Sequence, residues 1–510
     1  MKRTTLSLIA VATALAAVTG VASLTAPDGG AAPAPQATTR LPVERTSLLC
    51  PVPSRSEVAE TTYTSYTPLA AGKGRTTETG GTGGKAVRAE LKPAAAGTTP
   101  GAAPAKNPKA PKGPATVTKP GAPVTAEADG ATAPALTGTA NGTLAPGWTV
   151  QQTTVTPAGG ARGLLGTACT APDTDFWFPA ASTAKQRQDY VHLTNPDDSA
   201  AVADIELYGP NGLLKSQITE GIPVPAHSSV PVLLPTLTGD PAQQDVTVHV
   251  TTRSGRVGAV IGSADDKLGS DWLPASADPS ATAVLPGIPA DATSVRLVAY
   301  APGDDDADLK IQLVTPTGAI VPASAASLHV KSGMTAAVDM KDLMRGEPGS
   351  LRLSPSDPKK ATPVVAALQV VRGKGEAQEV AFIPAAAPIE GRATVADNRA
   401  KGSTLSLTAP GAAAEVLITA SAGSQGGTPV TKKLTLKAGT TTTLPAPVPE
   451  GLKGGYALTV EHVSGGPVHA SRMLELPRDG IPMFTVQTFN DDRSSVEVPA
   501  ARQNLSVLDD

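Results

Sequence analysis

Leu328-His-Val-Lys-Ser-Gly-Met-Thr-Ala-Ala-Val338 is the stretch that decides the fold, because two further segments repeat its spacing of apolar residues. These segments are Ile222-Pro-Val-Pro-Ala-His-Ser-Ser-Val-Pro-Val232 and Leu434-Thr-Leu-Lys-Ala-Gly-Thr-Thr-Thr-Thr-Leu444, and successive copies lie 106 residues apart. Each copy predicts a strand, a tight turn and a second strand, since apolar and polar residues alternate on both sides of a turn-forming residue. An internal repeat of this length indicates tandem copies of one folding unit.

Alternating segments upstream of these copies keep the same order in each repeat. They are Tyr190–Pro196 and Ala203–Tyr208 in the first repeat, Val295–Pro302 and Leu309–Val314 in the second, and Leu405–Pro410 and Ala414–Thr419 in the third. With the strands that follow, each repeat holds about six or seven strands. An immunoglobulin-like sandwich needs about 100 residues, whereas a propeller blade needs only about 40 to 50. We therefore predict an all-β protein with three tandem immunoglobulin-like β-sandwich units.

The composition excludes several other classes of protein. The chain has 510 residues, of which 50 are Gly and 49 are Pro, and both residue types interrupt long helices. Charged residues make up 17% of the chain, which is too few for a coiled coil. Lys and Arg number 42 against 45 Asp and Glu, so the charge balance predicts no nucleic-acid partner. Because aromatic residues are only 3% of the chain, we expect small cores.

The amino terminus has the features of an export signal. Lys2 and Arg3 precede an uncharged stretch whose apolar centre, Leu6–Leu15, matches the central region of a secretory signal peptide. The alternative is an uncleaved anchor, because Leu6–Leu24 spans 19 residues and is just long enough to cross a bilayer. In either case we expect residues 1–26 to direct the rest of the chain out of the cytoplasm, either secreted or anchored to the cell membrane.

Changes in composition predict the order of the remaining segments. Residues 27–45 predict a linker and residues 46–67 an N-terminal strand segment. Residues 68–147 are rich in Pro, Ala, Gly and Lys and lack apolar periodicity, so we expect a disordered linker there. Its basic part is either a solvated tether or a contact for anionic envelope polymers. The three sandwiches are expected at residues 148–280, 281–388 and 389–510.

The two cysteines agree with export. Cys50 and Cys169 form an even pair, which in an exported protein usually indicates a disulfide. Two unpaired buried thiols are the alternative. A bridge across so long a loop would contribute at most about 4 to 5 kcal/mol to stability.

Several motifs together resemble one protein family. They are Cys50-Pro-Val-Pro53, Arg162-Gly163 leading to Cys169, Phe176-Trp-Phe-Pro179 and the strand ending Leu193-Thr-Asn-Pro196. In these motifs the chain is similar to the DUF5719 proteins, an actinobacterial family of unknown function, over most of its length after about residue 45. The resemblance implies an exported envelope protein, and it supplies no catalytic residues.

Candidate binding residues are few. Trp177 and Trp272 could stack on sugars, although the sequence favours the alternative, in which they fill the core of the first sandwich or its junction with the second. An acidic turn could bind calcium, although Asp also stabilises tight turns through its own side chain. The residues of this turn are Asp304, Asp305, Asp306 and Asp308.

Three functional hypotheses follow from these features. The first is a non-enzymatic exported cell-envelope protein with a structural or protein-interaction role, whose partner is an unknown envelope protein or cell-wall polymer. The second is a carbohydrate-binding protein that uses the tryptophans. The third is a hydrolase or transpeptidase, since Ser182-Thr-Ala-Lys185 matches the Ser-x-x-Lys pattern, but the companion motifs are absent from the sequence. We expect no cofactor and no catalytic residues, and membrane contact only through the N-terminal segment if that segment is not cleaved.

Overall fold

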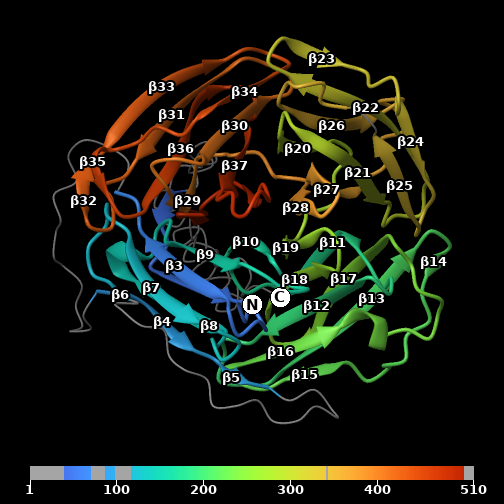
Figure 1. The fold of residues 1–510 in the computed structure, drawn as a ribbon, viewed down its shortest axis with the longest axis horizontal. Coiled ribbons are helices and arrows are strands. Elements are labelled where there is room, and N and C mark those ends of the chain that lie inside the picture. The colour runs from blue at the N-terminus through green and yellow to red at the C-terminus, as the bar shows by residue number, and fades with distance from the viewer. Residues whose placement is uncertain (1–38, 70–86, 98–115, 341–342, 499–510) are drawn as a thin grey trace, which may run out of the picture. The chain divides into compact units, whose positions relative to one another are not determined.

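The computed structural model describes residues 39–69, 87–97, 116–340 and 343–498 (Figure 1). The predicted signal or anchor at residues 1–26 lies outside the described residues, as does most of the predicted linker that follows it. The described chain consists of β-strands and two short 3-10 helices, η1 (Gly142–Leu144) and η2 (Leu234–Thr236). In this part of the chain, no helix is both long and apolar enough to cross a bilayer. The all-β prediction is confirmed.

The chain divides into two units. The smaller contains β1 (Thr39–Pro42) paired antiparallel with β39 (Ser495–Val498), with Arg40 and Glu497 forming an exposed ion pair. The larger unit, residues 43–494, contains four β-sandwiches, each made of two sheets around a shared core, and all strand pairs in these sheets are antiparallel except β5 with β16. We call them the N-terminal sandwich and sandwiches 1, 2 and 3.

The N-terminal sandwich uses eight strands. Its sheets have the orders β10-β9-β3-β7 and β2-β8-β4-β6. The strands are β2 (Arg45–Cys50), β3 (Glu60–Tyr66), β4 (Ala89–Pro93), β6 (Thr116–Val117), β7 (Val124–Asp129), β8 (Leu136–Asn141), β9 (Thr149–Thr156) and β10 (Gly163–Ala168). Cys50 of β2 and Cys169, which follows β10, form the expected disulfide and thereby join the two sheets.

Sandwiches 1 to 3 repeat one arrangement. Sandwich 1 contains β11 (Asp175–Ala181), β12 (Arg187–Thr194), β13 (Ala201–Gly209), β14 (Gly212–Leu213), β15 (Ile222–Val224), β16 (Ser228–Leu233), β17 (Val246–Ser254), β18 (Gly258–Asp265) and β19 (Gly269–Leu273), with β5 (Ala95–Ala96) added beside β16. Sandwich 2 contains β20 (Ala283–Ile288), β21 (Ala292–Tyr300), β22 (Ala307–Thr315), β23 (Gly318–Ile320), β24 (Ser327–Val330), β25 (Thr335–Met340), β26 (Gly349–Pro355), β27 (Val365–Lys374) and β28 (Ala377–Pro384). Sandwich 3 contains β29 (Arg392–Asn398), β30 (Ser403–Ala409), β31 (Ala414–Ala420), β33 (Val430–Leu436), β34 (Thr440–Pro445), β36 (Tyr456–Gly465), β37 (His469–Glu475) and β38 (Phe484–Thr488), with the small pair β32 (Gly426–Thr428) and β35 (Glu450–Lys453).

The segments that define the repeat occupy equivalent places. Each supplies a strand to one sheet, a turn, and a strand to the opposite sheet: β15 and β16, β24 and β25, β33 and β34. The turns contain His227, Gly333 and Gly439, with φ of 51°, 67° and 69°. The residue at this position has a left-handed backbone conformation in all three repeats, and this lets the chain turn sharply from one sheet to the other. Glycine adopts this conformation without strain, which explains why two of the three repeats have glycine there.

The structure differs from the prediction for residues 68–147. Their described parts, 87–97 and 116–147, contain strands β4 to β8, while residues 70–86 and 98–115 lie outside the described residues. Residues 148–168 accordingly belong to the N-terminal sandwich. The inward side chains here are small, as in β7 where Ala126 and Ala128 face the core, so the sequence shows no clear apolar period. The larger Tyr63 and Trp148 from neighbouring segments fill this core.

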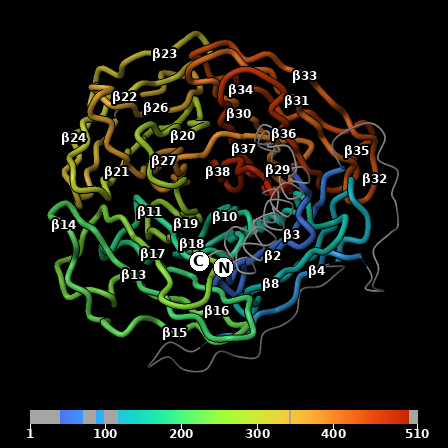
Figure 2. The backbone as a smooth tube through the Cα atoms, turned by 180° about the vertical axis from the view of Figure 1, so that it is seen from behind, coloured from blue at the N-terminus to red at the C-terminus, as the bar shows by residue number. Residues whose placement is uncertain are grey.

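The four sandwiches contact one another through their inner edge strands. Strand β10 contacts β19, β19 contacts β28, β28 contacts β38, and β38 contacts β10, so the contacts close a cycle (Figures 1 and 2). Apolar side chains from one sandwich complete the core of the preceding one. Phe382 of β28 is buried in the core of sandwich 1, and Phe484 of β38 in that of sandwich 2. The sandwiches therefore share core residues and are not independently packed domains.

Two buried carboxyl groups stand where the inner strands meet. The outward N–H groups of Leu164 and Gly166 on β10 donate to Glu379 Oε1 of β28 and Asp271 Oδ1 of β19, each at 3.0 Å. The Thr485 hydroxyl of β38 also donates to Asp271, at 3.0 Å from Oδ2. We call these groups the carboxyl junction. Strand β10 is an edge strand, and on this side it has no neighbouring strand to accept its N–H groups. The carboxyl junction supplies the missing acceptors, so these N–H groups are not left unpaired.

Burial dominates the electrostatics of the junction. It raises the pKa of Asp271 well above its usual range, and it raises the pKa of Glu379 to about 8. Arg162 lies 3.8 Å from Glu379 Oε2 and lowers that pKa, but less than burial raises it. The close approach of the Glu379 carboxyl group to β19 requires glycine at position 269, because a Cβ there would lie 2.7 Å from Glu379 Oε2. Glu379 is therefore largely protonated at neutral pH in the folded protein.

The raised pKa of Glu379 predicts a pH-dependent stability. The folded protein holds a proton that the unfolded chain releases above its ordinary pKa of 4.5. We expect the unfolding free energy to be highest below that value and to fall as pH rises toward 8, by up to about 1.4 kcal/mol per pH unit from this group. Denaturant titrations of E379Q should show a shallower fall between pH 5 and pH 8 than the wild type. E376Q, in the exposed turn before β28, is the control, and an unchanged slope in E379Q would contradict the assignment.

Candidate functional site

Strand β13 forms the floor of a surface groove. Its residues alternate between buried and half-buried positions along the whole strand, so Ile205 and Leu207 face the core of sandwich 1 while Glu206 faces outward. On one side β13 pairs with β17 from residue 202 to residue 208. On the other side β15 pairs with residues 201–203 and β14 with residues 208–209, which leaves the edge open at residues 204–206.

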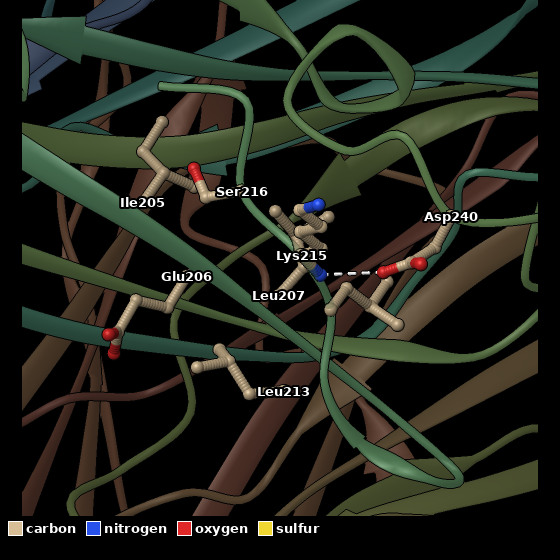
Figure 3. Close-up of a pocket in the computed structure, with 8 residues that line it drawn as sticks. Ile205, Glu206, Leu207, Leu213, Lys215, Ser216 and Asp240 are labelled. Atoms are coloured by element: carbon tan, nitrogen blue, oxygen red, sulfur yellow. Dashed lines mark hydrogen bonds between the residues drawn. The ribbon is translucent and has the colours of Figure 1, made fainter. Parts of the chain in front are cut away.

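The connecting chain leaves this edge open because it pairs elsewhere. Between β14 and β15, Ser216 forms a bridge with Thr238, and the N–H of Gln217 donates to the Leu237 carbonyl oxygen at 2.9 Å. Lys215 donates its N–H to Asp240 (Figure 3). The connection between β14 and β15 therefore pairs with residues 237–240 and not with the backbone of Ile205.

Two adjoining hollows lie between β13 and this connection, and together we call them the β13 groove. The first has a volume of about 360 Å³ and the second of about 260 Å³. Both are lined by Ile205, Glu206 and Ser216. Leu213 and Ile218 remain 59% and 41% exposed at the groove. Beside them Arg253 pairs with Asp204 through two hydrogen bonds of 2.6 and 2.8 Å, so an apolar rim adjoins an ion pair.

The other two repeats cover the equivalent edge. In sandwich 3, β33 pairs with β31 continuously from residue 414 to residue 420. In sandwich 2, β24 pairs with residues 307–310, and the next N–H, that of Ile311, donates to Ala326 at 3.0 Å. Among the three described repeats, sandwich 1 therefore leaves the longest open stretch at this edge.

An aromatic cluster lies on the outer face next to the groove. Trp177 stacks on His249 with ring centroids 3.6 Å apart and on Tyr300 of sandwich 2 at 5.4 Å. The Tyr208 hydroxyl donates to Glu206 at 2.8 Å, so the cluster and the groove share Glu206. Burial, then this hydrogen bond, raises the pKa of Tyr208, which keeps the phenol neutral. The cluster links sandwiches 1 and 2 and fixes one side of the groove.

Neither predicted sugar-stacking residue presents an open ring. Trp177 is 9% exposed and lies between His249 and Tyr300. Trp272 is 2% exposed and packs with Leu165 and Val260, with the ring of His192 against it edge-on. A sugar could reach neither ring face without displacing a packed neighbour, so the structure favours the alternative, in which both residues fill junctions between sandwiches.

In the acidic turn of sandwich 2, Asp306 and Asp308 are already engaged by neighbouring groups of the chain. Asp308 lies 2.7 Å from His329 Nδ1, and Asp306 lies 3.4 Å from His329 Nε2 and accepts from the N–H of Ser332. Asp304 and Asp305 are exposed. No group of three or more metal-ligating side chains with suitable geometry occurs among the described residues. The turn chemistry that Asp favours accounts for this segment, and the calcium hypothesis gains no support.

Ser182 is placed for structure rather than for nucleophilic attack. It is fully buried, and its hydroxyl donates to the Gln243 carbonyl oxygen at 3.1 Å and accepts from the N–H of Ala184. Its own N–H donates to Asp189, which is paired with the buried Arg187. Lys185 is exposed. The hypothesis of a Ser-x-x-Lys enzyme gains no support from this arrangement.

Sequence reasoning missed the β13 groove and the carboxyl junction. Both depend on which strand edges remain unpaired, and that follows from pairing between segments far apart in the chain. One signal was present for the groove: eight residues, Leu214–Gly221, connect two short strands that pair with the same neighbour, and this length exceeds what a continuous strand needs.

Comparison with known proteins shows the family. The sequence model described as "Family of unknown function (DUF5719)" matches residues 124–447, more than half of the chain, and the chain belongs to this family. The match begins at β7 of the N-terminal sandwich and ends just after β34 of sandwich 3. No curated protein matches the chain.

Burial of the aromatic rings predicts a simple optical result. The three tryptophans, Trp148, Trp177 and Trp272, are 4%, 9% and 2% exposed. We expect acrylamide to quench the tryptophan fluorescence of the native protein far less than that of the urea-unfolded chain, with no change on adding cell-wall oligosaccharides. W177F serves to assign any change to the outer cluster, and W148F is its control. Strong quenching of native Trp177 that a saccharide suppresses would restore the sugar-stacking hypothesis.

Proposed function

We propose that this member of the DUF5719 family is an exported, non-enzymatic protein of the cell envelope that presents the β13 groove to a protein partner. Export is supported by the disulfide between Cys50 and Cys169, a bond that forms and persists in oxidising compartments. The predicted signal or anchor at residues 1–26 agrees with the same destination.

The observation that carries the proposal is the open edge of β13. Its neighbours, Leu213 and Ile218, are large apolar side chains that remain exposed, and exposed apolar groups gathered beside polar ones are typical of recognition surfaces. An unpaired strand edge also offers backbone groups to an incoming chain. The groove therefore combines the two features by which sheets bind proteins.

The surrounding structure supports a binding role because it holds the groove rigidly. The Tyr208 carbonyl oxygen accepts from the Thr335 hydroxyl of sandwich 2 at 2.7 Å. Asp245 directly precedes β17, and its carboxylate forms an ion pair with Arg296 of sandwich 2 at 2.6 Å. A surface that is ordered before binding loses less conformational entropy when a partner docks.

Site-specific cross-linking tests the proposal in cells. A photo-cross-linking residue is placed at Leu213 or Ile218 in the full chain, with Ile320 and Val321 as controls, because these are similarly exposed in the hairpin of sandwich 2. We expect a discrete adduct from the groove positions and none from the controls, and protease added outside intact cells should reach the protein. L213D should reduce the adduct formed from Ile218 at least severalfold.

Two results would contradict the proposal. Equal adducts from the groove and control positions would remove the groove as the binding surface. A cytoplasmic protein with reduced Cys50 and Cys169 would remove the envelope role. Retention on purified cell wall that L213D leaves unchanged would instead indicate that the partner is a wall polymer bound elsewhere.

A further inference from the structure

Arg472 lies inside sandwich 3 with most of its guanidinium group unpaired. It belongs to β37, is 0% exposed, and is directly opposite the core residue Leu405 of β30, so its side chain enters the space between the two sheets. Its Nη2 donates to the Ala396 carbonyl oxygen of β29 in the other sheet at 3.3 Å. Its Nε and Nη1 have no hydrogen-bond partner among the described residues.

Within the described part of the chain, no carboxylate is in ion-pair contact with Arg472. Asp397, one residue from Ala396, is paired with Arg399 through hydrogen bonds of 2.9 and 3.0 Å. Burial lowers the pKa of Arg472 to about 10, so the group is still a cation at neutral pH. A buried cation without a paired anion is strongly unfavourable, and native proteins normally satisfy such a group.

Three other buried polar atoms of sandwich 3 are also unpartnered among the described residues. They are the Tyr456 hydroxyl, Asn398 Oδ1 and Gln487 Oε1. The two amides have fixed orientations, because Asn398 Nδ2 donates to the Val395 and Tyr456 carbonyl oxygens and Gln487 Nε2 donates to Thr485. Gln487 is directly opposite Arg472 in the sheet. Burial raises the pKa of Tyr456 to about 12, and the charge of Arg472 offsets part of that rise. Unpartnered donors and acceptors are thus concentrated on the strands of sandwich 3 around Arg472.

We propose that Arg472 binds a small monovalent anion, such as chloride or formate, inside sandwich 3. Nε–H and Nη1–H of Arg472 are adjacent donors, and the Tyr456 hydroxyl supplies a third. One negative charge neutralises the guanidinium group, so a monovalent anion matches the site. The oxygens of Asn398 and Gln487 accept hydrogen bonds from a water molecule that accompanies the anion.

Thermal unfolding of the full chain in different sodium salts at equal ionic strength tests the proposal. We expect chloride or formate to raise Tm by about 2 °C or more over gluconate, with saturation, because an anion that binds only the folded protein stabilises it. R472M should abolish this difference. R372M is the matched control, because Arg372 is also buried but is paired with Asp291 and Glu475, so its variant should keep the anion effect. No anion effect in the wild type, or an anion effect that R472M retains, would overturn the proposal.

A second measurement does not depend on a folded variant. Wild-type protein is unfolded, refolded in bromide and crystallised, so that an enclosed site is filled during folding. We expect an anomalous scattering peak within contact distance of Arg472 Nε. Density for water alone at this position would show that water satisfies the guanidinium group, and the anion site would be rejected.

Discussion

The constraint on which the structure depends is the unpaired inner edge of β10. Its outward N–H groups at Leu164 and Gly166 need buried acceptors, and Glu379 and Asp271 supply them from two other sandwiches. Thr485 adds a donor from sandwich 3, so one polar junction joins all four sandwiches. Because each carboxyl group is buried, losing a partner at any one sandwich would leave an unsatisfied polar group at the centre.

Apolar packing follows the same connectivity and explains how small cores suffice. With aromatic residues at only 3% of the chain, each sandwich has little large-side-chain volume of its own. Phe382 and Phe484 are therefore shared across junctions, and Arg187 and Arg372 lie over their rings at 5.3 and 4.9 Å. The same junctions fix the position of the β13 groove, since Tyr300 of sandwich 2 packs against Trp177 beside it. Stability and the binding surface thus depend on the same interfaces.

The sequence predicted the repeated sandwiches and the disulfide but missed the fourth sandwich. The repeat was visible because branched apolar residues alternate, as in Ile205 and Leu207, and because the turns recur at one spacing. In the N-terminal sandwich, Ala126, Ala128 and Ala140 take the inward positions, and alanine gives a weak strand signal. The groove, the carboxyl junction and Arg472 could not be predicted, because each depends on contacts between strands that lie far apart in the sequence.

Differential scanning calorimetry of the full chain tests the central claim, that the four sandwiches form one cooperative unit. If shared cores and the carboxyl junction join them, the larger unit should unfold in one main transition, with a calorimetric enthalpy close to the van't Hoff enthalpy. D271N should lower the temperature of that single transition without splitting it. Separate transitions for individual sandwiches in the wild type, each with its own van't Hoff enthalpy, would contradict the claim.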